Sequence, residues 1–88
     1  MKITYSEEKD SELQKDRGIS FRDFINKIMK LDILDDIKHP NITKYPNQRM
    51  FIIELENYAY LVPYVEDENG IFLKTAFPSR KLTKKYLR

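Results

Sequence analysis

The chain has 88 residues and a formal net charge of +2, with 34% charged and 41% hydrophobic residues. This length suits one domain with a single modest core, and the composition is that of a folded protein. The absence of cysteine excludes disulfides, thiolate metal sites and cysteine nucleophiles. No segment approaches the ~18 apolar residues of a transmembrane helix, and residues 1–10 lack the apolar region of a signal peptide. We therefore expect residues 1–88 to form one cytoplasmic domain.

The first third of the chain predicts a short strand and two helices. Residues 3–5 are a candidate strand, and Ser6 can cap a helix that Gly18 would end. Leu13 is nearly the only apolar residue of that helix, so we expect it on the surface. Residues 21–29 carry apolar side chains at helical spacing, and such a stripe must pack on a sheet.

The middle of the chain predicts a β-hairpin. Residues 31–37 can form a peripheral strand, and residues 38–47 form a loop because they contain two prolines. Residues 50–55 and 58–65 are rich in β-formers and are separated by two residues, of which Asn57 tolerates a positive φ. These two strands are therefore expected to pair directly.

The hairpin register sets the faces of the sheet. It pairs Arg49 with Tyr64, and it leaves apolar residues on both faces. One face should take the second helix, while a partner or a terminal helix covers the other. After an acidic turn, residues 71–77 form a third antiparallel strand that Pro78 ends. The length of the turn decides which face carries Lys74, and the sequence leaves this open.

The C-terminal segment, residues 79–88, gathers positive charge. Ser79 can cap a short helix that Leu82 and Tyr86 anchor to the protein. The segment has no acid and five cations: Arg80, Lys81, Lys84, Lys85 and Arg88. Lysine and arginine donate charge-assisted hydrogen bonds to phosphate oxygens and release counterions from nucleic acids. A phosphate-binding surface and a plain solvated terminus are both consistent with this pattern.

These elements predict an α+β fold. We expect an antiparallel sheet, made of a three-strand meander plus one or two short N-terminal strands, packed on two N-terminal helices and followed by a short C-terminal helix. The acidic residues do not predict a metal site, because the three aspartates within residues 32–36 have no histidine or further carboxylate at a ligand spacing.

The order of several short motifs resembles that of one protein family. Residues 5–9 (YSEEK) match an opening aromatic-Asp-Glu-x-Lys, and residues 18–21 (GISF) match a G-[IV]-S-F helix start. Arg49 stands where the family has an arginine before its first long strand, and residues 79–85 (SRKLTKK) match an S-A-R-K-A-T-R-R ending. The chain thus resembles, nearly from end to end, BrnT-type toxins, the ribonuclease half of a type II toxin–antitoxin pair with a RelE-like fold.

The resemblance implies a toxin that cleaves RNA and inhibits translation without a metal or other cofactor. In this reaction the 2′-hydroxyl attacks its own phosphodiester, which needs a base, cations around the phosphate and an acid for the leaving oxygen. The implied partners are an RNA substrate and a cognate antitoxin, and the resemblance allows a higher-order toxin–antitoxin assembly.

Four residues are candidates for the chemistry. Arg49, Arg80 and Lys81 can stabilise the phosphate, and we favour Arg80 because its planar fork can hold two oxygens at once. His39 is the acid–base candidate, although a histidine before a proline in a loop is more often a surface residue. The candidate RNA-binding residues are Lys74, Lys84, Lys85 and Tyr64.

Two alternatives stay open at this level. Tyr58, Tyr60 and Tyr64 can stack on unpaired bases, or they can be core or partner-contact residues. The function can also be binding without chemistry, in an RNA-binding or protein-interaction module that uses the same basic surface. Convergence of Arg49, Arg80 and Lys81 on one phosphate-sized cleft would favour the enzyme, and their separation along a surface would favour plain binding.

Overall fold

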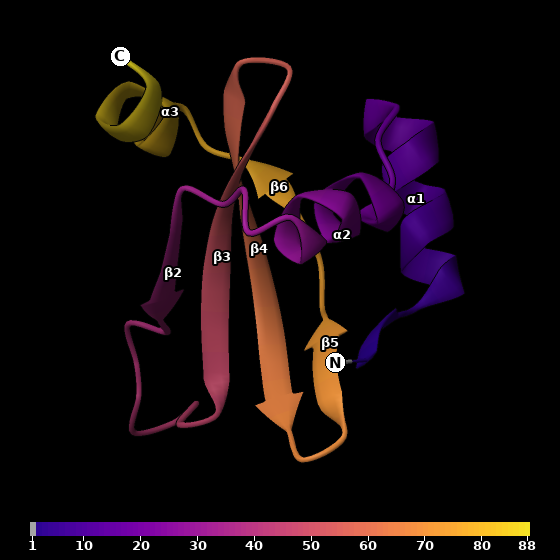
Figure 1. Cartoon of the computed structure of the whole chain (residues 1–88), viewed down its shortest axis with the longest axis vertical. Coiled ribbons are helices and arrows are strands. Elements are labelled where there is room, and N and C mark those ends of the chain that lie inside the picture. The colour runs from indigo at the N-terminus through magenta and orange to yellow at the C-terminus, as the bar shows by residue number, and fades with distance from the viewer. Residues whose placement is uncertain (1) are drawn as a thin grey trace.

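The structure, a computed structural model, describes residues 2–88, which form an α+β fold with three helices and one open sheet of six strands (Figure 1). The helices are α1 (Glu7–Arg17), α2 (Phe21–Met29) and α3 (Arg80–Leu87). The strands are β1 (Lys2–Tyr5), β2 (Asp35–Lys38), β3 (Gln48–Leu55), β4 (Tyr58–Asp67), β5 (Gly70–Leu73) and β6 (Phe77–Pro78). The sheet order is β1-β5-β4-β3-β2, and β6 pairs with β4 beyond the end of β5.

The sheet is mixed, so the prediction of an antiparallel sheet is wrong at one edge. β1 pairs with β5 in parallel, because the chain leaves β1 through two helices rather than through a hairpin. Gly70 permits this approach. A Cβ atom at Gly70 would collide with the backbone carbonyl oxygen of Lys2, and its φ of 137° lies outside the range that side chains favour.

The first helix, α1, begins and ends at the predicted caps. The Ser6 hydroxyl accepts a hydrogen bond from the Lys9 N–H, and Gly18 ends α1 with a φ of 68°. α1 is not wholly a surface helix, because it buries Asp10 together with its one leucine. The Asp10 carboxylate accepts the backbone N–H of Phe21 at 2.7 Å and so satisfies the first turn of α2.

The β3–β4 hairpin has the predicted register. Leu55 pairs with Tyr58 and Arg49 with Tyr64, and the two turn residues, Glu56 and Asn57, both have positive φ. The peripheral strand is also present, as β2, but it begins only at residue 35.

The third predicted strand is interrupted. β5 pairs Leu73 with Tyr64 and β6 pairs Phe77 with Leu61, so one extra residue lies between them, as in a β-bulge. Pro63 explains the position of this break: its carbonyl accepts the Lys74 N–H at 2.9 Å, but its nitrogen has no hydrogen to return. Pro78 is the last residue of β6, so the strand ends at this proline, which is itself part of the strand.

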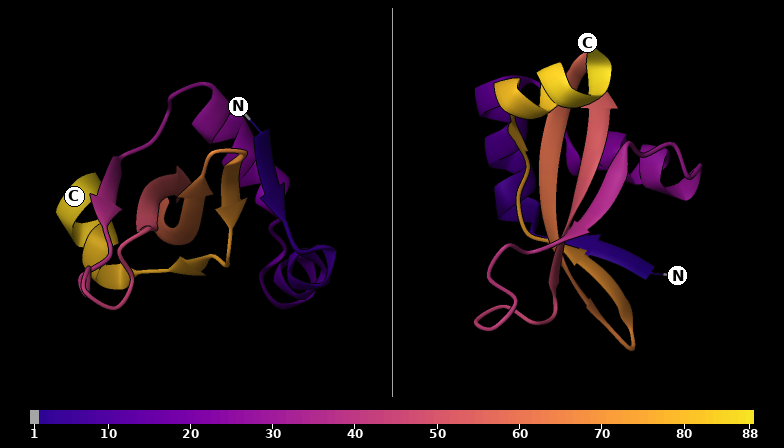
Figure 2. Two further views of the ribbon diagram at one scale, coloured as in Figure 1. Left: turned by 90° about the horizontal axis from the view of Figure 1, so that it is seen from below. Right: turned by 90° about the vertical axis from the view of Figure 1, so that its left-hand side faces the viewer.

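Helices cover both faces of the sheet. We call the side that packs against α2 the α2 face and the opposite side the α3 face (Figure 2). The main core lies on the α2 face, where Phe21 and Phe24 of α2 are fully buried with Ile53 and Val62 of the hairpin. On the α3 face, Ile52 is fully buried. The last helix therefore covers the apolar side that the first two leave open.

Candidate nucleic-acid interface

The predicted site residues lie on opposite faces of the sheet. Arg49 and Tyr64 pair with each other on the α2 face, near the sheet end that is far from the β3–β4 turn. The cations of α3 lie on the other face. Lys74 is opposite Pro63, a position that alternation assigns to the α3 face. The structure thus resolves the face of Lys74, which the sequence left open.

The guanidinium group of Arg49 donates hydrogen bonds to two neighbouring residues on the α2 face. Its Nε–H donates to Asp36 Oδ1 at 3.1 Å and to the Tyr64 hydroxyl at 3.2 Å, and its Nη2 donates to the Asp36 carbonyl at 3.1 Å. The Tyr64 hydroxyl donates in turn to Asp36 Oδ1 at 2.7 Å. This network occupies part of the guanidinium fork that phosphate binding would use.

Tyr64 is a core residue. Only 2% of its surface is exposed, and its ring stacks on that of Phe51 with centroids 4.1 Å apart. Burial, followed by the hydrogen bond to Asp36, raises the pKa of the Tyr64 phenol well above its usual range, so the phenol stays neutral. Tyr60 also packs inside, with its ring 5.5 Å from that of Phe24. Neither ring is placed to stack on a base.

His39 lies just beyond β2, at the same end of the sheet as Arg49. Its backbone N–H donates to the Gln48 carbonyl, and its Nδ1 accepts the backbone N–H of Asn41 at 3.0 Å. Its ring lies 4.5 Å from that of Tyr45. These contacts hold the imidazole within its own loop, away from α3.

The cations of α3 and the residues that attach the helix to the sheet lie on opposite sides of the helix. At 100° per residue, Arg80, Lys84 and Lys85 fall within an arc of about 140°. Lys81 and Arg88 fall within the same arc, and the side chains of all five cations are exposed. The opposite side of the helix carries Thr83, which is only 1% exposed. The helix therefore presents a continuous basic stripe to solvent.

Hydrogen bonds fix α3 to the sheet at two places. The Thr83 hydroxyl accepts the backbone N–H of Ala59 at 2.9 Å and donates to the Ser79 carbonyl at 2.7 Å. Near the other end of the helix, the Tyr86 hydroxyl donates to Asp35 Oδ2 at 2.6 Å. This bond lowers the pKa of the Asp35 carboxyl and raises that of the Tyr86 phenol.

Another row of side chains lies on the α3 face, along β5, β6 and the residues between them. The row consists of three residues that lie opposite residues 61, 63 and 65 of β4: Phe77, Lys74 and Phe72, in that order. Their side chains point to one face, and neighbouring members of the row are about 6.6 Å apart along β4. Phe72 is 42% exposed and Phe77 40% exposed. Two open aromatic rings with a lysine between them can bind unpaired bases and a phosphate.

Arg49 does not share a cleft with the start of α3. The Ser79 N–H donates to the carbonyl of Ala59, the residue that pairs with Glu54. Glu54 and Arg49 are five positions apart on β3, about 17 Å along the strand, and Arg49 faces the other side of the sheet. The expected cluster of Arg49, Arg80 and Lys81 is therefore split between the two faces.

Sequence reasoning missed three residues of the α3 face: the exposed Phe72 and Phe77, and the buried Thr83 that attaches α3 to the sheet. The alternation of the third strand contains the signal for the phenylalanines, but the face it gives them depends on the turn length and on the bulge. Nothing local marks Thr83, because its partner, Ala59, lies 24 residues away.

Residues 2–88 contain no group of three or more metal-ligating side chains placed to hold an ion. In the same part of the chain, no helix combines the length and apolarity needed to cross a membrane. Comparisons with protein-family models, curated proteins and solved structures find no match to this chain.

Proposed function

We propose that this protein acts on RNA as the toxin of a type II toxin–antitoxin pair, with a RelE-like fold and metal-independent endoribonuclease activity. The observation that carries the proposal is the exposed side of α3, which presents five cations, while Lys74 and two exposed phenylalanines lie on the same face of the sheet. Cations that follow a backbone and aromatic rings that stack on bases are the two means by which proteins bind single-stranded RNA.

The toxin identity rests on the order of the motifs in the sequence, and the α+β architecture is compatible with it. In this proposal Arg80 and Lys81 stabilise the charge on the phosphorane, and Lys84 and Lys85 bind the flanking phosphates. Arg49 holds the sheet edge through Asp36 instead of contacting RNA.

Binding without cleavage is the second candidate function. It is favoured by the separation of Arg49 from Arg80, because fewer cations then surround one phosphate. Both candidates use the same surface, so only a measurement of RNA integrity distinguishes them.

The test is inducible expression in a bacterial host, with growth and bulk RNA integrity followed together. Wild-type protein should arrest growth and fragment RNA. Arg80→Ala should fold normally and lower the cleavage rate by about 100-fold or more, because one donor to transition-state charge is removed. Arg22→Ala, which removes an exposed arginine of α2, is the matched control and should behave as wild type.

Two results separate the candidates. Intact RNA and normal growth with folded wild-type protein that still binds single-stranded RNA would establish the binding module. Folded protein that neither cleaves nor binds RNA would contradict both proposals.

A further inference from the structure

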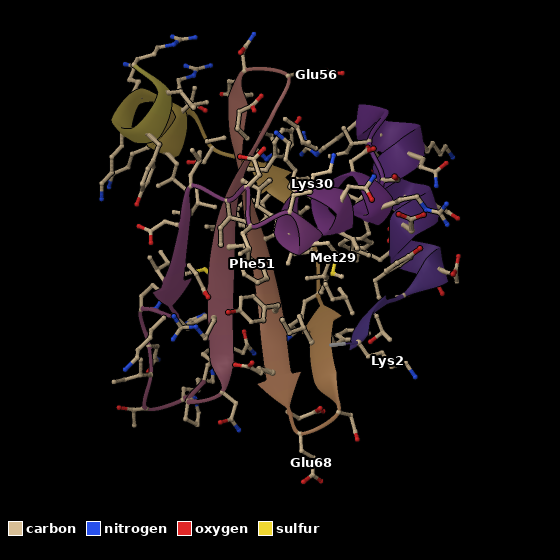
Figure 3. All side chains as sticks on the ribbon, viewed as in Figure 1. Lys2, Met29, Lys30, Phe51, Glu56 and Glu68 are labelled. Carbon is tan, nitrogen blue, oxygen red and sulfur yellow. The ribbon has the colours of Figure 1, made fainter. Side chains whose placement is uncertain are left out.

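A groove of about 600 Å³ lies on the α2 face, beside the C-terminal end of α2. Figure 3 shows this region below α2, between Met29 and the ring of Phe51. Its apolar lining comes from the end of α2, the following loop and the sheet: Ile3, Met29, Leu31, Ile33, Phe51 and Ile71. The groove is thus a continuation of the core that no element within residues 2–88 covers.

Leu31, on the rim of this groove, is unusual in two respects. It is 85% exposed, and it adopts a left-handed conformation with a φ of 57°. Its N–H donates to the Ile28 carbonyl while the Asp32 N–H donates to the Lys27 carbonyl, so it occupies the helix-ending position at which glycine is usual. Neither feature stabilises the isolated protein. Together with Met29, which is 63% exposed, Leu31 forms an apolar rim that favours contact with another chain.

The open part of the α2 face has room for one helix. The ring of Phe24 packs against that of Tyr60, so α2 crosses the sheet at the level of Tyr60 and its pairing partner Ile53. Arg49 is four positions further along β3, about 13 Å from that level. Helices pack side by side at about 8–10 Å. A second helix next to α2 would therefore have its axis between the level of Phe51 and that of Arg49, and the Arg49 network would lie under its outer edge.

The lining of the groove also includes charged side chains. They are those of Asp36, Arg49 and Glu66. Asp36 and Arg49 form a salt bridge, whereas Glu66 is exposed and makes no salt bridge to any residue between 2 and 88. A cation on the occupant would complement Glu66.

We propose that this groove binds the apolar face of an amphipathic helix from a partner protein, with a lysine or arginine of that helix at Glu66. The identification of the partner as the antitoxin rests on the proposed function. The groove is on the opposite side of the sheet from α3, so contacts of the helix and contacts of RNA involve different residues.

The test uses the full chain and the small protein encoded by the adjoining gene, with the dissociation constant measured by calorimetry. Leu31→Gly removes the exposed side chain and relieves the left-handed backbone. Its midpoint of urea unfolding should be unchanged or higher, whereas its binding should weaken about tenfold or more. A residue that serves only the fold would not show this opposite pair of effects.

A charge reversal provides a second, matched test. Glu66→Lys should weaken binding severalfold, whereas Glu68→Lys should not. The two residues carry the same charge and lie two positions apart, but Glu68 is at the tip of the β4–β5 turn and points away from the groove (Figure 3).

Three results would overturn the proposal. One is the absence of a complex with the adjoining gene product, and another is full affinity in both Leu31→Gly and Glu66→Lys. The third is a wild-type dimer in sedimentation that Leu31→Gly dissociates, because a second copy of the chain would then fill the groove. None of these results concerns RNA, so loss of RNA cleavage in Arg80→Ala would still support the proposed function.

Discussion

The two faces of the sheet are held by different forces. On the α2 face, Phe21 and Phe24 are fully buried, and the helix is bound mainly by non-directional apolar contact. On the α3 face, Thr83 and Tyr86 hold the helix through hydrogen bonds at defined positions, while the cations remain in solvent. Apolar residues are buried on both faces, and on the α3 face hydrogen bonds at defined positions also set where the charges lie.

Two adjacent residues of β2 show this division. Asp36 points to the α2 face and bonds Arg49 and Tyr64, whereas Asp35 points to the α3 face and bonds Tyr86. Successive side chains of a strand alternate in direction, so a pair of aspartates serves both faces.

The largest effect should come from removing charge on α3. The double variant Lys84→Gln/Lys85→Gln should lower the affinity for single-stranded RNA about 25-fold at 0.1 M salt, because two phosphate contacts are lost. Fluorescence anisotropy across a salt series should show the slope of log affinity falling by about 1.4. The control Lys15→Gln/Arg22→Gln makes the same change in charge on α1 and α2. Equal losses in both double variants would show that net charge, rather than the α3 face, binds RNA.

The second largest effect should come from replacing Thr83, the buried residue that attaches α3 to the sheet. Thr83→Val keeps the shape of the side chain but leaves the buried N–H of Ala59 without its acceptor, which should lower the free energy of unfolding by about 1–3 kcal/mol. Urea titration measures this loss, and Thr43→Val in the exposed loop should change little. RNA affinity should also fall, since α3 is less firmly placed. Wild-type stability in Thr83→Val would mean that apolar contact alone holds α3.

The smallest effect should be the pH dependence of the Asp35–Tyr86 bond. The pKa of Asp35 is lowered from 3.8, so its contribution to stability is present above pH 3.8 and is lost as the pH falls through the lowered value. The pKa of Tyr86 is raised from 10.0, so its contribution is present below pH 10.0 and is lost as the pH rises through the raised value.

The measurement is the urea midpoint of wild type and of Tyr86→Phe over a range of pH. It tests whether the Asp35–Tyr86 bond stabilises the protein only between the two shifted pKa values. The gap between the two proteins should be constant near neutral pH and should close toward both extremes. Asp16→Asn, on α1, should leave the wild-type profile unchanged. A gap that stays constant as the pH is lowered far into the acid range would show that Asp35 is not the partner that matters.

Local sequence patterns were enough to predict much of the fold. Ser6 and Gly18 bound α1, Ser79 starts α3, and the two residues between β3 and β4 set a register that the structure confirms. Each of these signals acts within a few residues, so it does not depend on the rest of the chain. The candidate site was predicted less well, because its residues come from separate elements.

Long-range contacts decided the rest. The parallel edge at β1 depends on the approach of Lys2 to Gly70, and the burial of Asp10 depends on the start of another helix. The separation of Arg49 from Arg80 depends on which face α3 covers, and this depends on Ala59 and Thr83 meeting across 24 positions.

The sequence by itself thus determined the identity of the elements, their caps and the β3–β4 register, because hydrogen bonds and periodicity operate over a turn or two of chain. Only the tertiary structure decided the faces, since strand alternation converts a one-residue bulge or a shorter turn into a change of side. The β4–β5 turn puts Lys74 on the α3 face, whereas the apolar groove beside Arg49 lies on the other face.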